Sequence, residues 1–175
     1  MRSMVEVPPF LRGDIEGVHG LVSVWMRNLE EVEEIVQKWA SDLPAEGFWW
    51  VPAPEANPIG GLIRHIGGSS YRLFLRGTGQ EIPPALRKRP PEELAPTGEP
   101  PAEVLQVFAE QMEQVRIGLR RLGSEDLERR VQVGPHSVRA IYVLDHIGAH
   151  ALHHAGQIIT TRKLWNARSA NGNRP

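Results

Sequence analysis

The chain has 175 residues, of which 41% are apolar and 23% charged, and this composition is typical of a soluble globular protein with one sizeable core. Its 20 basic and 21 acidic residues give a formal net charge of −1, without the basic excess typical of proteins that bind nucleic acid. The absence of cysteine excludes disulfides, thiolate metal sites and cysteine nucleophiles, and it fits a cytoplasmic location. The sequence lacks a signal-peptide pattern and any apolar run long enough for a membrane helix, so we expect no membrane partner.

Two helices are predicted in the first half of the chain. Over residues 18–43, apolar side chains recur every three or four positions, which indicates an amphipathic helix. A connector rich in proline and tryptophan follows, and it ends in Asn57 and Pro58, which are a typical helix cap and first helical residue. A second helix is therefore predicted over residues 58–77. Its inward stripe consists of Ile59, Leu62, His65, Ile66, Ser69 and Leu73.

The second half of the chain predicts two more helices. Residues 78–101 contain too many prolines for a regular element, which indicates a long ordered loop over one end of the protein. A third helix is predicted over residues 101–122, before the stop signal Gly123. Residues 129–139 alternate around a Gly-Pro pair and indicate a short two-stranded hairpin. A fourth helix is predicted from about Ser137 to Trp165.

These elements predict an all-α four-helix bundle, because each helix has one apolar face that must be buried against the others. We expect one domain over residues 1–175, with its core at about residues 18–166. The tail, residues 167–175, has no apolar pattern, and we expect it to be disordered.

Four of the seven histidines, His146, His150, His153 and His154, lie in one stretch of the fourth helix, DHIGAHALHHAGQ. At about 100° per residue, His146, His150 and His154 spread over about 80° of the helix surface. The alternative set of His146, His150 and His153 spreads over about 60° of the helix surface. Either set contains an i, i+4 pair whose imidazoles can point at one ion. The spacing does not decide between His153 and His154.

A third ligand is expected from a neighbouring helix, and His65 is the best-placed candidate. It lies in GGLIRHIGGS, at a position where the helical stripe calls for an apolar residue. A buried imidazole needs a polar partner, and a metal ion is one such partner. A lone histidine in this position is more often a hydrogen-bonded core residue. The apolar residues around the histidines of the fourth helix nevertheless favour a metal site over an incidental surface cluster.

Other metal motifs fit the sequence poorly. It contains no HExxH, and only residues 16–19 have the Glu-x-x-His form that di-iron bundles use in pairs. No general acid or base is identified. Asp145 lies about 140° around the helix from His150 and is expected to face elsewhere. Arg64 and Arg72 are expected to reach solvent.

The pairing of GGLIRHIGGS with LDHIGAHALHHAGQI resembles the DinB/YfiT-like superfamily of metal-binding four-helix bundles, and the resemblance extends over residues 20–166. In that family, a histidine of the second helix and an i, i+4 pair on the fourth hold a divalent metal. By position, the resemblance implies His65, His150 and His154 as ligands. Zinc or nickel is the first expectation for the ion, with iron or manganese as alternatives. The resemblance also implies that Gly156 allows close helix approach, and that Gln157 supports a ligand or makes a structural hydrogen bond.

The resemblance implies a metal-dependent enzyme with a small-molecule substrate, because three imidazoles leave a coordination position open. A divalent ion there can acidify water or deprotonate a thiol. Two reactions follow, namely transfer of a low-molecular-weight thiol to an electrophile, or hydrolysis by metal-bound water. The alternative is a non-catalytic bundle in which the metal is structural or sensory. No nucleic-acid partner is expected, and a homodimer is expected from the family.

Overall fold

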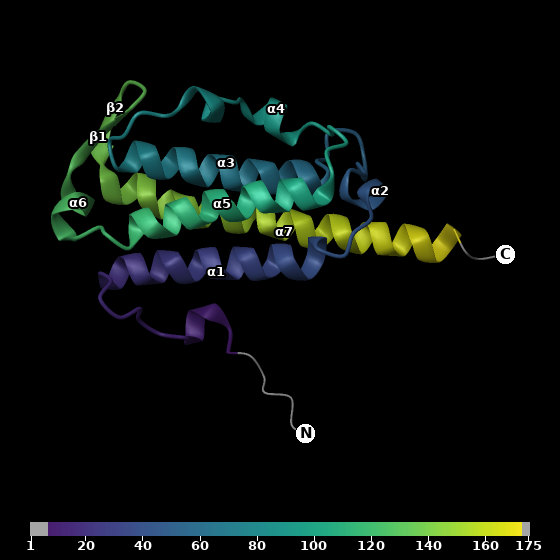
Figure 1. Cartoon of the computed structure of the whole chain (residues 1–175), viewed down its shortest axis with the longest axis horizontal. Helices are drawn as coiled ribbons and strands as arrows, with labels where there is room; N and C mark the ends of the chain where they lie inside the picture. The colour runs from purple at the N-terminus through teal and green to yellow at the C-terminus, as the bar shows by residue number, and fades with distance from the viewer. Residues whose placement is uncertain (1–6, 173–175) are drawn as a thin grey trace.

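A computed structural model of the chain describes residues 7–172, with side chains for residues 7–168, and four long helices form a bundle (Figure 1). The long helices are α1 (Gly20–Ala40), α3 (Ile59–Gly77), α5 (Pro101–Leu119) and α7 (Ala140–Gly172). The shorter elements are η1 (Pro9–Leu11), α2 (Ala45–Phe48), η2 (Pro84–Leu86), α4 (Pro90–Leu94), α6 (Ser124–Glu128), β1 (Arg130–Val133) and β2 (His136–Arg139). The predicted all-α four-helix bundle with a small hairpin is confirmed.

The core joins all four long helices, and its most extensive contacts are those of α3 with α5 and α7, and of α1 with α7. Each long helix contributes side chains that are at most 2% exposed, among them Leu29, Ile63, Ile66, Met112, Val115, Ile147 and Ile158. Burial of each such side chain stabilises the fold by roughly 1.5–3 kcal/mol relative to exposure. Apolar burial therefore accounts for the association of the helices. Among residues 7–172, no helix is both long enough and apolar enough to cross a membrane.

The ends of two helices differ from their predicted positions. The prediction that the fourth helix begins near Ser137 is wrong, because Ser137 and Val138 pair with Gln132 and Val131 across the hairpin, and α7 begins only at Ala140. The predicted Asn57 cap is also wrong, since Pro58 precedes the first helical residue of α3 and no side chain caps it.

At its other end, α7 continues past Trp165 to Gly172. The Arg168 guanidinium stacks on the rings of Trp50 and Trp165, at 5.7 and 5.2 Å from their centroids. This contact joins the last turns of the helix to the tryptophan-rich connector. The tail expected to be disordered comprised residues 167–175; residues 167–172 belong to α7, and residues 173–175 lie outside the described residues.

The proline-rich segment between α3 and α5 contains η2 and α4 and lies along the outer side of α3 (Figure 1). Arg64 of α3 donates hydrogen bonds to the carbonyl oxygens of Glu93 and Ala95, both at 2.6 Å. The other terminal nitrogen of Arg64, Nη1, pairs with the Glu99 carboxylate at 2.7 Å. The expectation that Arg64 reaches solvent is therefore wrong. Its guanidinium attaches the segment to the bundle.

Gly61 allows α4 to pack directly on α3, because a Cβ atom there would lie 2.3 Å from the carbonyl oxygen of Leu94. A backbone atom cannot move aside as a side-chain end can, so any larger residue must displace α4. At Gly156, by contrast, no atom lies within 4 Å of a built Cβ. The expectation that Gly156 allows close helix approach is therefore wrong.

We expect Gly61→Ala to destabilise the protein by about 1–3 kcal/mol, because the added methyl group overpacks the contact between α3 and α4. Gly156→Ala is the control, and it should stabilise the protein by up to about 1 kcal/mol, because alanine favours an exposed helix interior. Urea unfolding of both variants measures the difference. Equal midpoints for Gly61→Ala and the wild type would contradict the close contact.

Candidate metal centre

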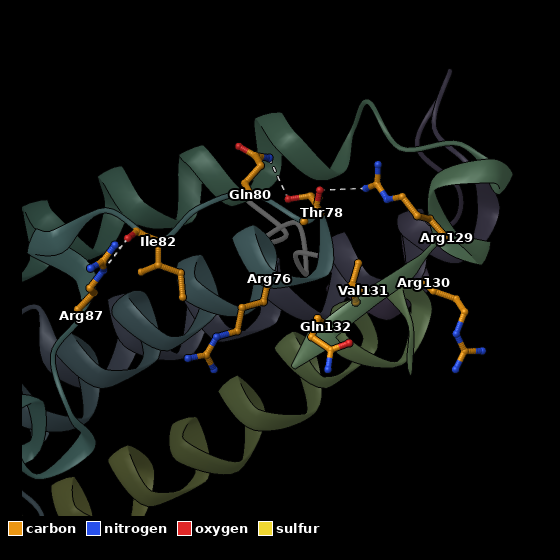
Figure 2. A pocket seen from close by; sticks show the side chains of 10 residues that line it. Arg76, Thr78, Gln80, Ile82, Arg87, Arg129, Arg130, Val131 and Gln132 are labelled. Atoms are coloured by element: carbon orange, nitrogen blue, oxygen red, sulfur yellow. Dashed lines mark hydrogen bonds between the residues drawn. The ribbon is translucent and has the colours of Figure 1, made fainter. Parts of the chain in front are cut away.

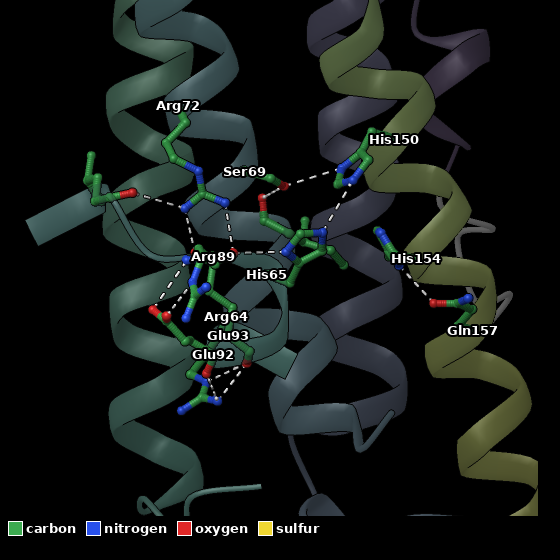
Figure 3. A network of polar contacts seen from close by, with 12 residues as sticks. Arg64, His65, Ser69, Arg72, Arg89, Glu92, Glu93, His150, His154 and Gln157 are labelled. Carbon is green, nitrogen blue, oxygen red and sulfur yellow. Dashed lines mark hydrogen bonds and ion pairs between the residues drawn. The ribbon is translucent and has the colours of Figure 1, made fainter. Parts of the chain in front are cut away.

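Three histidines from two helices converge in the structure. His65 of α3 meets His150 and His154 of α7, and their ligand atoms all lie within 4.8 Å of one another (Figure 3). The Nε2 atoms of His65 and His150 are 3.3 Å apart. His65 is buried and the other two are half-buried. This group could hold a metal ion.

The helices place these side chains at the boundary between the core and a cavity. His150 and His154 lie one turn apart on α7, each followed by a fully buried alanine, Ala151 or Ala155. His65 precedes the fully buried Ile66 on α3. Because α3 and α7 pack along each other, the polar edge of one helix faces that of the other. The three imidazoles therefore meet beside the core.

Each of the three imidazoles uses its Nδ1 atom for a contact within the protein (Figure 3). His65 Nδ1 lies 2.9 Å from a carboxylate oxygen of Glu93, and His154 Nδ1 lies 2.8 Å from the amide oxygen of Gln157. His150 Nδ1 lies 3.2 Å from the Ser69 hydroxyl oxygen, which also lies 3.2 Å from the Ile66 carbonyl oxygen. The partners of His65 and His154 are acceptors, so the Nδ1 atom of each of these two rings carries a proton.

In a neutral ring with its proton on Nδ1, the Nε2 atom has a free lone pair that can bind a metal ion. The Nε2 atoms of His65 and His150 lie 3.3 Å apart, so both can reach one ion placed between the two helices. Neutral imidazoles with Nδ1 bonded to the protein are the usual form of histidine metal ligands. The residues present therefore fit a divalent cation bound through three Nε2 atoms.

A buried carboxylate orients the histidine of α3. Besides His65, the Glu93 carboxylate binds both terminal nitrogens of Arg72, at 2.5 and 2.7 Å. Burial opposes ionisation of Glu93, but the hydrogen bonds from His65 and Arg72 outweigh it and lower the pKa of this carboxyl group. Glu93 is therefore an anion whose charge Arg72 balances. The expectation that Arg72 reaches solvent is wrong, since Arg72 is 9% exposed.

Sequence reasoning missed Glu93, which lies in the proline-rich segment beside a second glutamate, Glu92. The nearest signal is the pair of glycines after His65. A Cβ atom at Gly68 would lie 2.3 Å from the Glu93 carboxylate, so glycine makes room for the acid. The pattern indicates a close approach but does not identify the residue that approaches.

The two candidate ligands on α7 are held in the neutral form. Burial, together with the neighbouring histidines, lowers the pKa of His150 to about 4. Burial also lowers the pKa of His154, although its hydrogen bond with Gln157 opposes the shift. Neutral imidazole is the form that binds metal, so no proton has to be displaced from these residues near neutral pH.

The remaining candidates lie outside the three-histidine group. His146 and His153 are exposed, and their rings lie 5.7 Å from that of His150 and 5.2 Å from that of His154. Asp145 faces away from the three histidines, as expected, and its carboxylate accepts a hydrogen bond from the Trp25 indole of α1 at 2.9 Å. Gln157 does contact a candidate ligand, as described above.

A cavity of about 440 Å³ opens beside the histidines. His65 and His150 form part of its wall, together with Ser69 and His146. An ion bound by the three Nε2 atoms would therefore be reached from this cavity. A site with an open side of this kind can accept water or substrate as a further ligand.

The fold is a helical bundle in which three histidines from two helices could hold a metal ion. The chain is a member of the DinB superfamily, because the model of that family matches residues 28–158, more than half of the chain. Among curated protein sequences, none matches it significantly.

Solved structures share the fold at low sequence identity. A conserved protein from Enterococcus faecalis has a TM-score of 0.69 at 14% identity, over 84% of this chain and 98% of its own. A DinB-like protein from Bacillus subtilis has a TM-score of 0.61 at 19% identity, over 83% and 91%. YfiT from Bacillus subtilis, described as a probable metal-dependent hydrolase with an unusual four-helix bundle topology, has a TM-score of 0.64 at 15% identity, over 85% and 90%.

We expect the wild-type protein to bind about one equivalent of zinc or nickel, and His65→Ala and His150→Ala each to lose it, because two imidazoles rarely hold a divalent ion tightly. His153→Ala is the control, since His153 is an exposed imidazole of the same helix. Mass spectrometry of untagged protein after metal exposure and desalting measures the content. Loss of metal in His153→Ala, but not in His65→Ala, would contradict the assigned set.

We expect Glu93→Gln to weaken metal binding by about 10–100-fold, because the carboxylate that orients His65 is lost. Glu92→Gln is the matched control, since its side chain is exposed and contacts Arg89 instead of a histidine. Competition titration with a chromophoric chelator gives both affinities, and circular dichroism checks the fold of each variant. Equal affinities in two folded variants would remove Glu93 from the metal site.

Proposed function

We propose that this protein, as a single domain, is a metal-dependent enzyme that acts on a small molecule, and that His65, His150 and His154 are its metal ligands. The observation that carries the proposal is the convergence of three imidazoles from two helices beside an open cavity, whose wall includes His65 and His150. Imidazole suits zinc and nickel, which are therefore the ions to test first.

The reaction that fits this site activates a small nucleophile beside a bound substrate. A divalent ion at three imidazoles would supply Lewis-acid activation of water or of a thiol. Hydrolysis and transfer of a low-molecular-weight thiol to an electrophile both fit that chemistry. The similarity to YfiT, described as a probable metal-dependent hydrolase, supports testing hydrolysis first.

The protein's own side chains supply the remaining functions. Glu93, Ser69 and Gln157 hold the three rings in one tautomer and orientation. His146 lines the same cavity one turn from His150, and it makes no hydrogen bond within the described part of the chain. An exposed imidazole in that place is suited to accept or deliver a proton during the reaction.

The packing of the bundle supports a catalytic role over a purely structural one. The four long helices bury a continuous set of apolar side chains, so the fold has its own source of stability. The histidines lie at the edge of that core and open to a cavity. A structural metal would instead be expected in a closed site with four protein ligands.

The proposal predicts that metal removal abolishes activity and leaves the protein folded. Zinc- and nickel-loaded protein should hydrolyse an activated ester, or transfer 2-mercaptoethanesulfonate to chlorodinitrobenzene, at least tenfold faster than chelator-treated protein. His153→Ala should retain the activity and His150→Ala should lose it. Far-ultraviolet circular dichroism follows the fold in parallel. Unfolding on metal removal, without activity in the loaded protein, would favour the structural alternative.

A further inference from the structure

We infer that the cavity beside the histidines selects a substrate that carries an oxyanion group, a carboxylate or a phosphate, and that Arg76 is the main residue that binds this group. The inference rests on the proposed function, because it assigns a substrate class to the same site. It is carried by the charges along the cavity, the pairing of each cation and the position of Arg76 on α3.

The cavity wall carries an excess of positive charge that the whole chain lacks. The chain has a formal net charge of −1. Five of the residues that line the cavity are nevertheless arginine or lysine, and no described aspartate or glutamate lines it. These five are Arg72, Arg76, Arg87, Lys88 and Arg89. A concave surface that is lined by positive charges raises the local concentration of anions.

The cations of the wall differ in how far their charge is already balanced. Arg72 is neutralised by the buried Glu93. Arg87 pairs with Glu81 and Arg89 with Glu92, each at 2.8 Å, but these side chains are largely exposed, and exposed pairs of this kind are weak. Within the described residues, the side chains of Arg76 and Lys88 make no hydrogen bond or ion pair, and of these two only Arg76 lies on the helix that carries His65.

The helical register places Arg76 on the histidine side of α3. His65, Ser69, Arg72 and Arg76 follow one another at spacings of four, three and four residues. From His65 to Arg76 the helix makes about three full turns plus 20°, so the two residues lie on nearly the same face. Along the helix axis they are separated by about 16 Å. Arg76 therefore stands at the far end of the cavity that His65 begins.

A neighbouring cavity supports the choice of Arg76. It shares Arg76, Ile82 and Arg87 with the first cavity (Figure 2). The two other arginines of this neighbouring cavity are engaged in hydrogen bonds to the backbone. Arg129 donates to the Thr78 carbonyl at 3.0 Å, and Arg130 donates to the Ser137 carbonyl at 2.6 Å. In Figure 2 the Arg76 guanidinium points away from both of them, into the space beside α7.

These observations describe a substrate with two ends. The reactive atom lies at the three Nε2 atoms, and the oxyanion lies several bonds away at the Arg76 guanidinium, whose planar fork suits carboxylates and phosphates. Arg87, on the segment between α3 and α5, can reinforce binding by exchanging Glu81 for the ligand. A cationic substrate of the same size is repelled.

Because Arg76 lies about 16 Å along α3 from His65, the test uses probes with a long spacer. Cobalt-loaded protein is titrated with four thiols that share a six-carbon chain and differ at the end away from the sulfur. These are 6-mercaptohexanoate and 6-mercaptohexanesulfonate, which are anions, together with neutral 6-mercaptohexanol and cationic 6-aminohexanethiol. Thiolate binding to cobalt produces a charge-transfer absorption band, which gives a dissociation constant for each probe. We expect both anions to bind at least tenfold more tightly than 6-mercaptohexanol, and 6-aminohexanethiol to bind most weakly. Tighter binding of the carboxylate would show that the site prefers a planar oxyanion. Tighter binding of the sulfonate would show that it prefers a tetrahedral one.

The variants Arg76→Gln and Arg120→Gln then assign the effect to a residue. Both arginines are exposed and lie at the C-terminal end of a long helix, and Arg120 lines none of the cavities described here. Arg76→Gln should reduce the preference for anions to less than threefold, and Arg120→Gln should leave it unchanged. Equal reduction in both variants would show a general charge effect and overturn the assignment to Arg76.

The failure of this inference can be told apart from failure of the proposed function. If the protein binds no cobalt, the three-histidine metal site is wrong, and the substrate class falls with it. If cobalt binds, but the four thiols bind equally or none of them binds, the metal site stands and the oxyanion inference is overturned.

Discussion

The buried carboxylate of Glu93 is the interaction on which the arrangement around His65 depends. A carboxylate removed from water is costly unless its charge is balanced and its oxygens are hydrogen-bonded. Arg72 balances the charge, and His65 occupies one oxygen through its Nδ1 proton. The same contact fixes the tautomer of His65 and turns its Nε2 atom toward α7. Loss of any one of the three side chains would leave a buried polar group without its partner.

This interaction requires the proline-rich segment to lie against α3. Gly61 and Gly68 remove the side chains that would keep the segment away, and Arg64 binds its backbone carbonyl groups. The segment is thereby part of the site, since it contributes Glu93 to the histidine and Arg87 to the cavity wall. A region without a long regular element thus positions both the candidate metal ligand and the charge at the cavity.

The residues that stabilise the bundle are different from those that form the candidate site. The apolar core of the bundle spans all four long helices, whereas the histidines lie between α3 and α7 at the edge of that core, beside the cavity. Partial burial keeps His150 and His154 neutral, with the pKa of each below its usual value. The cavity still admits small molecules to the same atoms. A site of this kind can lose its ion without the helices losing the contacts that hold them together.

The sequence by itself determined the four helices and the histidine pattern, because both follow from local periodicity. Apolar residues at helical spacing predicted the bundle, and the run from His146 to His154 indicated a metal site. The register left His153 and His154 as alternatives, and the family resemblance favoured His154. The structure likewise brings His154 to His65, while His153 is exposed.

Only the tertiary structure decided which groups support the histidines and which charges line the cavity. Glu93 lies 28 positions after His65, and Arg72 was expected in solvent, so no local pattern could pair them. The starts of α3 and α7 also depended on their surroundings, since the pairing of β2 with β1 delays the start of α7. Periodicity reports which face of a helix is buried. It carries no information about which distant segment covers that face, because that depends on packing between elements.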